Sequence, residues 1–156
     1  MNKLWAPWRI HYIQAKKVKE CVFCKIASQK TDQANFILYR SQYCFAVLNI
    51  FPYNNGHSMI VTNRHVKSLE KLEDSELLDI MKTLVKTKAK IKKILKPEGF
   101  NVGINLGKES GAGIAGHLHI HLVPRWRGDT NFMPVIAKTK IISQSLKELC
   151  RQFKKK

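Results

Sequence analysis

The most informative segment of the chain reads Gly116-His117-Leu118-His119-Ile120-His121-Leu122-Val123-Pro124. In a β-strand successive side chains point to opposite faces, so the three histidines share one face and the aliphatic residues between them share the other. The aliphatic face is suited to burial, and the histidine face is suited to lining a cleft. Neighbouring histidines on such a strand lie roughly 6.5–7 Å apart, so several imidazoles can reach one phosphate.

Histidine is well suited to nucleophilic attack on phosphorus near neutral pH. Its unperturbed pKa of about 6.5 leaves a large uncharged fraction, in which one ring nitrogen has a free lone pair. Covalent attack divides a difficult displacement into two easier steps, and flanking histidines and loop amides can stabilise the phosphoryl oxygens. The same pattern also fits a chance alternation of histidines or a metal site, because His-x-His on a strand chelates zinc.

Around this segment the pattern predicts a sheet with one long helix. Strands are expected over 35–39, 43–48, 57–62, 100–105 and 118–124. The amphipathic helix is expected from Asp74, its N-cap, to Lys96, with Pro97 and Gly99 ending it, and a terminal helix is expected over Ile141 to Phe153. The fold class is therefore predicted as α+β with a mainly antiparallel five-stranded sheet. The 156 residues suit one domain, 1–156, with 1–20 and 138–153 as extensions.

The amino-acid composition and the net charge indicate which kinds of molecule the protein can bind. The chain is 44% hydrophobic and carries a net charge of +17, so its surface attracts phosphate-bearing molecules and binds nucleic acid nonspecifically. Many lysines lie between Lys82 and Lys96 or at the C-terminus, a distribution typical of a solvated helix face and a frayed end. The first 14 residues have no apolar h-region and no run is long enough to span a bilayer, so we expect a cytoplasmic protein.

Two of the four cysteines form the motif Cys21-Val-Phe-Cys24, whose spacing is that of metal ligands or of a redox pair. Cys44 and Cys150 fall in apolar runs and are expected to be buried thiols. Without a secretion signal a disulfide framework is not expected. A pair of reduced surface thiols is the plainer alternative for Cys21 and Cys24.

The triad segment resembles the signature of the histidine-triad superfamily of nucleotidyl hydrolases and transferases. The likeness extends from about Cys21 to Asp129. It includes Val47-Leu-Asn-Ile50, Asn55-Gly-His57 and Asn63-Arg-His65, similar to the family's ribose-binding strand and following turn, and Asn105-Leu-Gly107, similar to the position before its glycine loop. Leu4-Trp-Ala-Pro-Trp-Arg9 and Val123-Pro-Arg-Trp126 resemble the branch of diadenosine tetraphosphate phosphorylases and hydrolases.

The resemblance implies roles for individual residues. The implied catalytic set is His119 as nucleophile with His121 and His57 at the α-phosphate, and the implied substrate-binding set is Asn49 at the ribose, Asn105 at the scissile phosphate and Gly113 in the loop. Relatives often have Gln-Ser or Gln-Thr in that loop, where this chain has Gly111-Ala-Gly-Ile-Ala-Gly116. Loop amides are expected to replace the missing side chain, which leaves the leaving-group contacts undefined. Arg125 and Arg127 follow the strand and either meet distal phosphates or are solvated.

Some triad relatives, among them the galactose-1-phosphate uridylyltransferases, hold zinc on Cys-x-x-Cys, a distant histidine and the first triad histidine. The matching residues here are Cys21, Cys24, His65 and His117, which are ligand types that zinc accepts in closed tetrahedral sites. The resemblance therefore implies a structural zinc that ties the N-terminal segment to the sheet, with no metal required for the chemistry.

The expected activity is cleavage of a nucleoside polyphosphate, diadenosine tetraphosphate above all, through a nucleotidyl-His119 intermediate. The phosphorylase-like motifs and the charge favour inorganic phosphate over water as the second attacking group. A homodimer is expected because relatives pair through sheet and helix. Two rival functions remain: a nucleoside phosphoramidase or adenylate-removing enzyme, and a non-catalytic nucleotide- or RNA-binding module.

Overall fold

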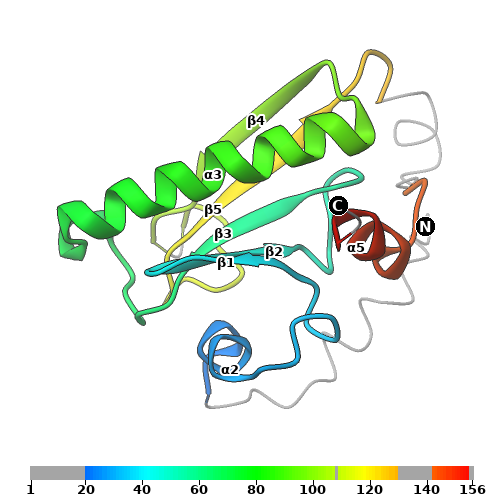
Figure 1. Cartoon of the computed structure of the whole chain (residues 1–156). Helices are drawn as coiled ribbons and strands as arrows, with labels where there is room; N and C mark the ends of the chain where they lie inside the picture. Colours follow the sequence, from blue (N-terminus) through cyan, green and yellow to red (C-terminus); the bar gives the residue numbers. More distant parts are fainter. Residues whose placement is uncertain (1–19, 108, 130–141, 155–156) are drawn as a thin grey trace, which may run out of the picture.

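A computed structural model describes residues 20–107, 109–129 and 142–154 (Figure 1). Five antiparallel strands form one sheet in the order β1-β2-β3-β5-β4. The strands are β1 Ile37–Arg40, β2 Cys44–Leu48, β3 Ser58–Thr62, β4 Gly99–Ile104 and β5 His119–Arg125. The helices are α2 Val22–Ser28, α3 Asp74–Leu95 and α5 Leu146–Lys154, with a 3-10 turn at Leu69–Lys71. The predicted α+β class and antiparallel five-stranded sheet are confirmed.

The sheet is covered by different helices on its two faces (Figure 1). α3 and α5 bury aliphatic residues of β2, β3 and β5 on one face, including Ile60, Ile120 and Leu122. On the other face the short helix α2 inserts Phe23 among residues such as Met59 and Val61. Alternate residues of the central strands therefore supply two separate apolar clusters, and one end of the second cluster borders the histidines.

Several boundaries differ from the predictions for local reasons. α5 begins at Leu146, because the Ser145 hydroxyl accepts a hydrogen bond from the Glu148 N–H at 3.3 Å and caps the helix there. α3 is capped by Glu73 rather than Asp74, since the Glu76 carboxylate accepts the Glu73 N–H at 3.0 Å. The helix ends at Leu95, where the next residue turns left-handed, and α2 was not predicted at all.

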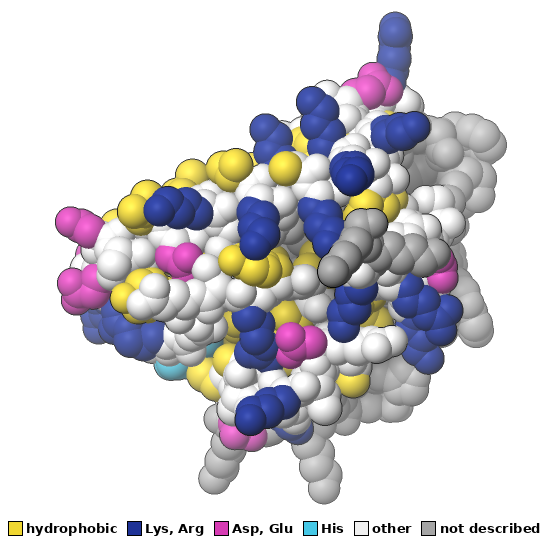
Figure 2. All heavy atoms as spheres, in the orientation of Figure 1, with side chains coloured by type: hydrophobic (Ala, Val, Ile, Leu, Met, Phe, Trp, Pro, Cys, Tyr) yellow, Lys and Arg dark blue, Asp and Glu magenta, His cyan; other side chains and the backbone are white. Residues whose placement is uncertain are grey.

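α3 exposes its lysines, as predicted for a solvated helix face, and Figure 2 shows basic side chains spread over this side of the molecule. Ile80, Leu84 and Ile91 are buried against the sheet. The apolar residues Met81 and Val85 are instead 51% and 62% exposed, because the apolar stripe is wider than the contact with the sheet. Within the described ranges no helix has the length and apolar character needed to cross a membrane.

Candidate functional site

Two of the three histidines lie in the first half of β5, which pairs with β3 on one side and β4 on the other. His119 and His121 occupy the face covered by α2, whereas Ile120 and Leu122 belong to the core under α3. The alternation predicted from the sequence is therefore present. His117 lies just before the strand and is 1% exposed.

His119 is held in a single orientation by its backbone neighbour. Its Nδ1 lies 2.8 Å from the carbonyl oxygen of His117, and since a carbonyl only accepts, Nδ1 carries the proton. In the neutral ring Nε2 is then left with its lone pair, the form needed for attack on phosphorus. The ring of Phe23 lies 5.2 Å away between ring centroids. Phe23 was not identified from the sequence. Its place between the two cysteines of the Cys-Val-Phe-Cys motif was the signal that it lies near His117.

A chain of hydrogen bonds determines the proton positions on His57 and His121. The backbone N–H of Tyr53 donates to Nδ1 of His57 at 2.9 Å, so in the neutral ring the proton of His57 lies on Nε2. That Nε2 donates to Nδ1 of His121 at 2.9 Å. The proton of neutral His121 must then be on Nε2, where it is a donor for a phosphoryl oxygen. Burial first, and then His119, lowers the pKa of His121, which favours this neutral form.

Asn49 directly follows β2 and lies beside His57. Its side-chain oxygen accepts the Phe51 N–H at 2.9 Å, and its Nδ2 lies 3.4 Å from Nδ1 of His57. The ring of Tyr53 stacks on His57 with centroids 4.7 Å apart, a contact that the sequence did not indicate. Asn49 therefore lies next to the histidine cluster.

A cavity of about 450 Å³ opens beside His121. Asn105 lines it, but Gly113 does not; that glycine lies in the exposed turn before β5. Gly103 faces His121 across the β4–β5 pair, and its lack of a side chain leaves the cavity open there. The cavity therefore starts at His121 and extends toward the end of β5, where Arg125 and Asp129 line it.

The four predicted metal ligands meet at the other end of the triad. One donor atom from each of Cys21, Cys24, His65 and His117 lies within 4.8 Å of every other. Nδ1 of His117 is 3.3 Å from the Cys21 sulfur and 3.5 Å from the Cys24 sulfur, and Nδ1 of His65 is 3.2 Å from the Cys24 sulfur. The grouping inferred from the resemblance is therefore present in space.

The surroundings of this cluster fit a metal ion. Nε2 of His117 donates to the carbonyl oxygen of Thr62 at 2.8 Å, so the lone pair of Nδ1 points at the two sulfurs. Burial, and then the neighbouring Cys21 thiol, raise the pKa of Cys24, so two adjacent thiolates would need a compensating positive charge. A divalent cation would supply that charge, and two thiolates with two neutral imidazoles are a donor set that zinc accepts.

Comparison with known proteins identifies the family of this chain. Residues 30–128 match the family model described as HIT domain. The chain is 39% identical over 160 residues to an AP-4-A phosphorylase of Mycobacterium tuberculosis strain H37Rv, which covers 97% of this chain and 82% of that protein. It is 31% identical over 93 residues to the asymmetrical bis(5'-nucleosyl)-tetraphosphatase of Schizosaccharomyces pombe, covering 60% of this chain and 50% of that protein.

The fold agrees with a crystal structure of a Zn-bound histidine triad family protein from Mycobacterium smegmatis. The TM-score is 0.69 at 24% identity, and the match covers 86% of this chain and 90% of the other. The family model matches well over half of the chain, and the tuberculosis relative is similar along nearly all of it. This protein therefore belongs to the HIT domain, or histidine-triad, family.

Proposed function

We propose that this protein cleaves dinucleoside polyphosphates, diadenosine tetraphosphate first among them, through a nucleotidyl intermediate on His119. The observation that carries the proposal is the His119 ring, whose Nδ1 is committed to the His117 carbonyl and whose Nε2 keeps its lone pair. The names of the two relatives, an AP-4-A phosphorylase and an asymmetrical tetraphosphatase, support this substrate class.

In the first step Nε2 of His119 attacks the α-phosphorus. A phosphorus–nitrogen bond forms and the bond from phosphorus to the bridging oxygen breaks, so the remaining polyphosphate leaves with the bonding electron pair. The positive charge that develops on the ring is stabilised by the His117 carbonyl, which accepts the Nδ1 proton. His121 donates from Nε2 to a phosphoryl oxygen and stabilises the charge that accumulates there.

In the second step an oxygen nucleophile attacks the same phosphorus and the bond to His119 breaks. Inorganic phosphate as the nucleophile yields ADP, whereas water yields AMP. We favour phosphate, because the most extensive likeness among these relatives is to a phosphorylase and because a net charge of +17 concentrates anions near the protein. The Leu4–Arg9 motif that also favours phosphate lies outside the described residues.

We also propose that Cys21, Cys24, His65 and His117 bind one zinc ion with a structural role. The ion would supply the positive charge that keeps both thiols deprotonated, and all four donors come from the protein, so no position is left for a reacting water. The Zn-bound relative from Mycobacterium smegmatis supports the choice of metal. Bound there, it would join the start of α2 to the end of β3.

A homodimer is the proposed assembly. β4 is an edge strand of the sheet, and its Val102 is 52% exposed. On α3 the residues Leu78, Met81 and Val85 are all more than half exposed at helical spacing, and Figure 2 shows hydrophobic side chains along the upper edge of that helix. Exposed apolar stripes and unpaired strand edges are surfaces that proteins usually cover. Sedimentation of wild type against Met81→Glu tests the assembly, and a monomeric wild type contradicts it.

Product analysis tests the activity. The protein is incubated with diadenosine tetraphosphate with and without inorganic phosphate, and the nucleotides are separated. We expect ATP and ADP, formed only when phosphate is present. ATP and AMP at a rate independent of phosphate would make the protein a hydrolase. Turnover confined to a phosphoramidate or to adenylated DNA would favour the rival enzymes, and AMP binding without any turnover would favour a binding module.

A further inference from the structure

The cavity beside His121 ends at a charged group that the chemistry at His119 does not use. Arg125 is the last residue of β5 and lies on the same face as His121, four residues earlier. Of the described residues that line the cavity, it is the one with a positive charge. Its side chain is 46% exposed, so the guanidinium is accessible from the cavity.

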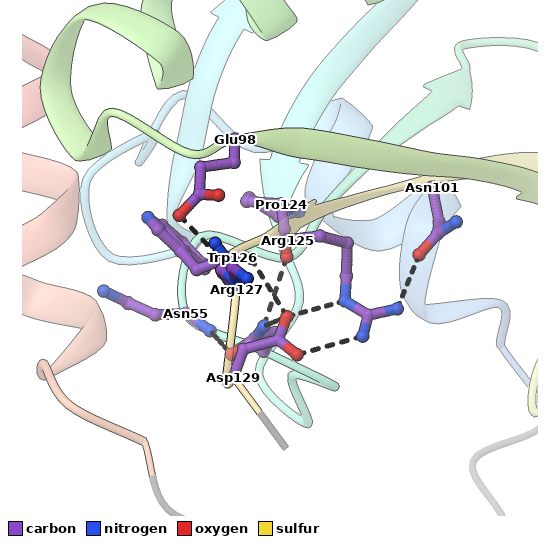
Figure 3. Close-up of polar contacts among 9 residues, drawn as sticks. Asn55, Glu98, Asn101, Pro124, Arg125, Trp126, Arg127 and Asp129 are labelled. Atoms are coloured by element: carbon purple, nitrogen blue, oxygen red, sulfur yellow. Dashed lines mark hydrogen bonds and ion pairs between the residues drawn. The ribbon is translucent and has the colours of Figure 1, made fainter. Parts of the chain in front are cut away.

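Neighbouring side chains hold this guanidinium in place (Figure 3). Its Nε and Nη2 donate to the two carboxylate oxygens of Asp129 at 2.6 and 2.9 Å, and its Nη1 donates to the Asn101 side-chain oxygen at 2.8 Å. An arginine has five N–H donors, and these contacts use three of them. Two donors therefore remain on a group whose orientation is already determined, which lowers the entropic cost of binding an anion.

Asp129 also lines the cavity, but its carboxylate is largely covered by its partners. Its side chain is 8% exposed, and besides Arg125 it accepts hydrogen bonds from Nδ2 of Asn54 at 2.8 Å and from the Trp126 N–H at 3.2 Å. Both of its oxygens therefore already accept hydrogen bonds from the protein. An anion that enters the cavity therefore meets a carboxylate that is mostly covered and a guanidinium that is half exposed and has two donors left.

We propose that this cavity is the subsite for the polyphosphate of the leaving group, with Arg125 binding the phosphates farthest from the attacked one. The proposal rests on the function proposed above. The Cα atoms of His121 and Arg125 are roughly 13 Å apart along the strand, so a single phosphate held at the histidines does not reach Arg125, whereas a chain of several does. Arg125 would thereby supply the leaving-group contact that the glycine loop lacks.

Binding measurements test the subsite without relying on turnover. ATP represents the leaving group and AMP represents the transferred nucleotide, and both are titrated calorimetrically into wild type, Arg125→Ala, Arg125→Lys and Arg127→Ala. Losing hydrogen bonds to a charged group should weaken ATP binding by about ten- to a hundredfold in Arg125→Ala and leave AMP binding unchanged. Arg125→Lys keeps the positive charge but lacks the planar set of guanidinium donors, so we expect a smaller loss of ATP affinity than in Arg125→Ala. Arg127, which is exposed and does not line the cavity, is the matched control.

Kinetics provide the second test. Diadenosine tetraphosphate has a polyphosphate leaving group, and adenosine 5'-phosphoramidate leaves only ammonia. We expect Arg125→Ala to lower kcat/KM for the tetraphosphate by a similar factor and to leave phosphoramidate cleavage within about twofold of wild type, which also shows that the variant is folded. Unchanged ATP affinity in both Arg125 variants, or an equal loss for ATP and AMP, overturns the subsite. A wild type that binds ATP through Arg125 but cleaves neither substrate overturns the proposed function and keeps the anion site.

Discussion

Nε2 of His57 lies 2.9 Å from Nδ1 of His121, and the Tyr53 N–H on the far side of His57 sets the direction of that hydrogen bond. One backbone amide therefore decides which nitrogen of His121 carries a proton. If His121 became positively charged, its Nδ1 would gain a proton and the hydrogen bond from His57 would be lost. The arrangement requires a neutral His121.

Stability should therefore depend on pH through His121. Burial and His119 lower its pKa below the ordinary 6.5, so between the folded and unfolded pKa values the unfolded chain binds more protons. The free energy of unfolding should rise with pH over that interval and level off above about 6.5. Urea unfolding from about pH 5 to pH 8 measures this, with His121→Gln as the comparison, which should have a shallower slope. Identical slopes would contradict the assigned protonation.

His119→Ala should lower turnover of diadenosine tetraphosphate by at least about a thousandfold and leave AMP binding nearly intact, because the substitution removes only the nitrogen that forms the covalent bond. Rapid acid quench and mass spectrometry of wild type should detect a nucleotidyl group on His119. Arg127→Ala, which changes an exposed residue that does not line the cavity, should still form the adduct. Full activity without His119 would remove it as the nucleophile.

Zinc should be present at about one atom per chain after purification without added metal, as measured by elemental analysis with inductively coupled plasma mass spectrometry. Cys21→Ser should lose the metal and several kcal/mol of stability, since the site forms only in the folded chain and metal binding therefore contributes directly to folding. Cys150→Ala is the control for metal content, because that buried thiol lies in α5, away from the cluster. The four-ligand assignment fails if no zinc is found and Cys21 and Cys24 both titrate as free thiols.

Asn49→Ala should raise KM for ribonucleotide substrates more than for the 2'-deoxy analogue. A side-chain amide that reads the ribose contributes binding only when the hydroxyl is present to pair with it. The Asn49 side-chain oxygen also accepts a hydrogen bond from the Phe51 N–H, so KM is expected to rise somewhat for both sugars. The difference between the two increases is therefore the informative quantity. Equal losses would exclude Asn49 from the ribose site.

Gly56→Ala should destabilise the turn that leads into His57. Gly56 has φ +76°, and a Cβ there would lie 2.6 Å from Cδ1 of Leu95 and 3.2 Å from Cγ of Pro124. We expect a loss of about 1–3 kcal/mol in the free energy of unfolding, measured by urea denaturation. Gly99→Ala is the control, because its Cβ would have no neighbour within 4 Å. If Gly56→Ala leaves the free energy of unfolding unchanged, the turn accommodates the added methyl group without strain and the prediction is wrong.

The antiparallel sheet, the long helix, the shared face of the histidines and the grouping of the Cys-x-x-Cys motif with His65 and His117 were all predictable from the sequence. The first three depend on periodicities of two and 3.6 residues, which are local properties of the chain. The ligand grouping came from the family resemblance, which carries information about distant contacts that local patterns do not.

Other features depend on tertiary contacts. α2 is seven residues long, too short to be stable alone, and it exists because Phe23 packs against the sheet and the histidine rings. Arg125 and Arg127 look equivalent in sequence, but β5 ends at Arg125, so only that side chain remains on the cavity face. The tautomer of His121 depends on His57, 64 residues earlier, because the pairing of β3 with β5 brings the two rings together. Contacts of this kind follow from strand register and burial, which no short stretch of sequence encodes.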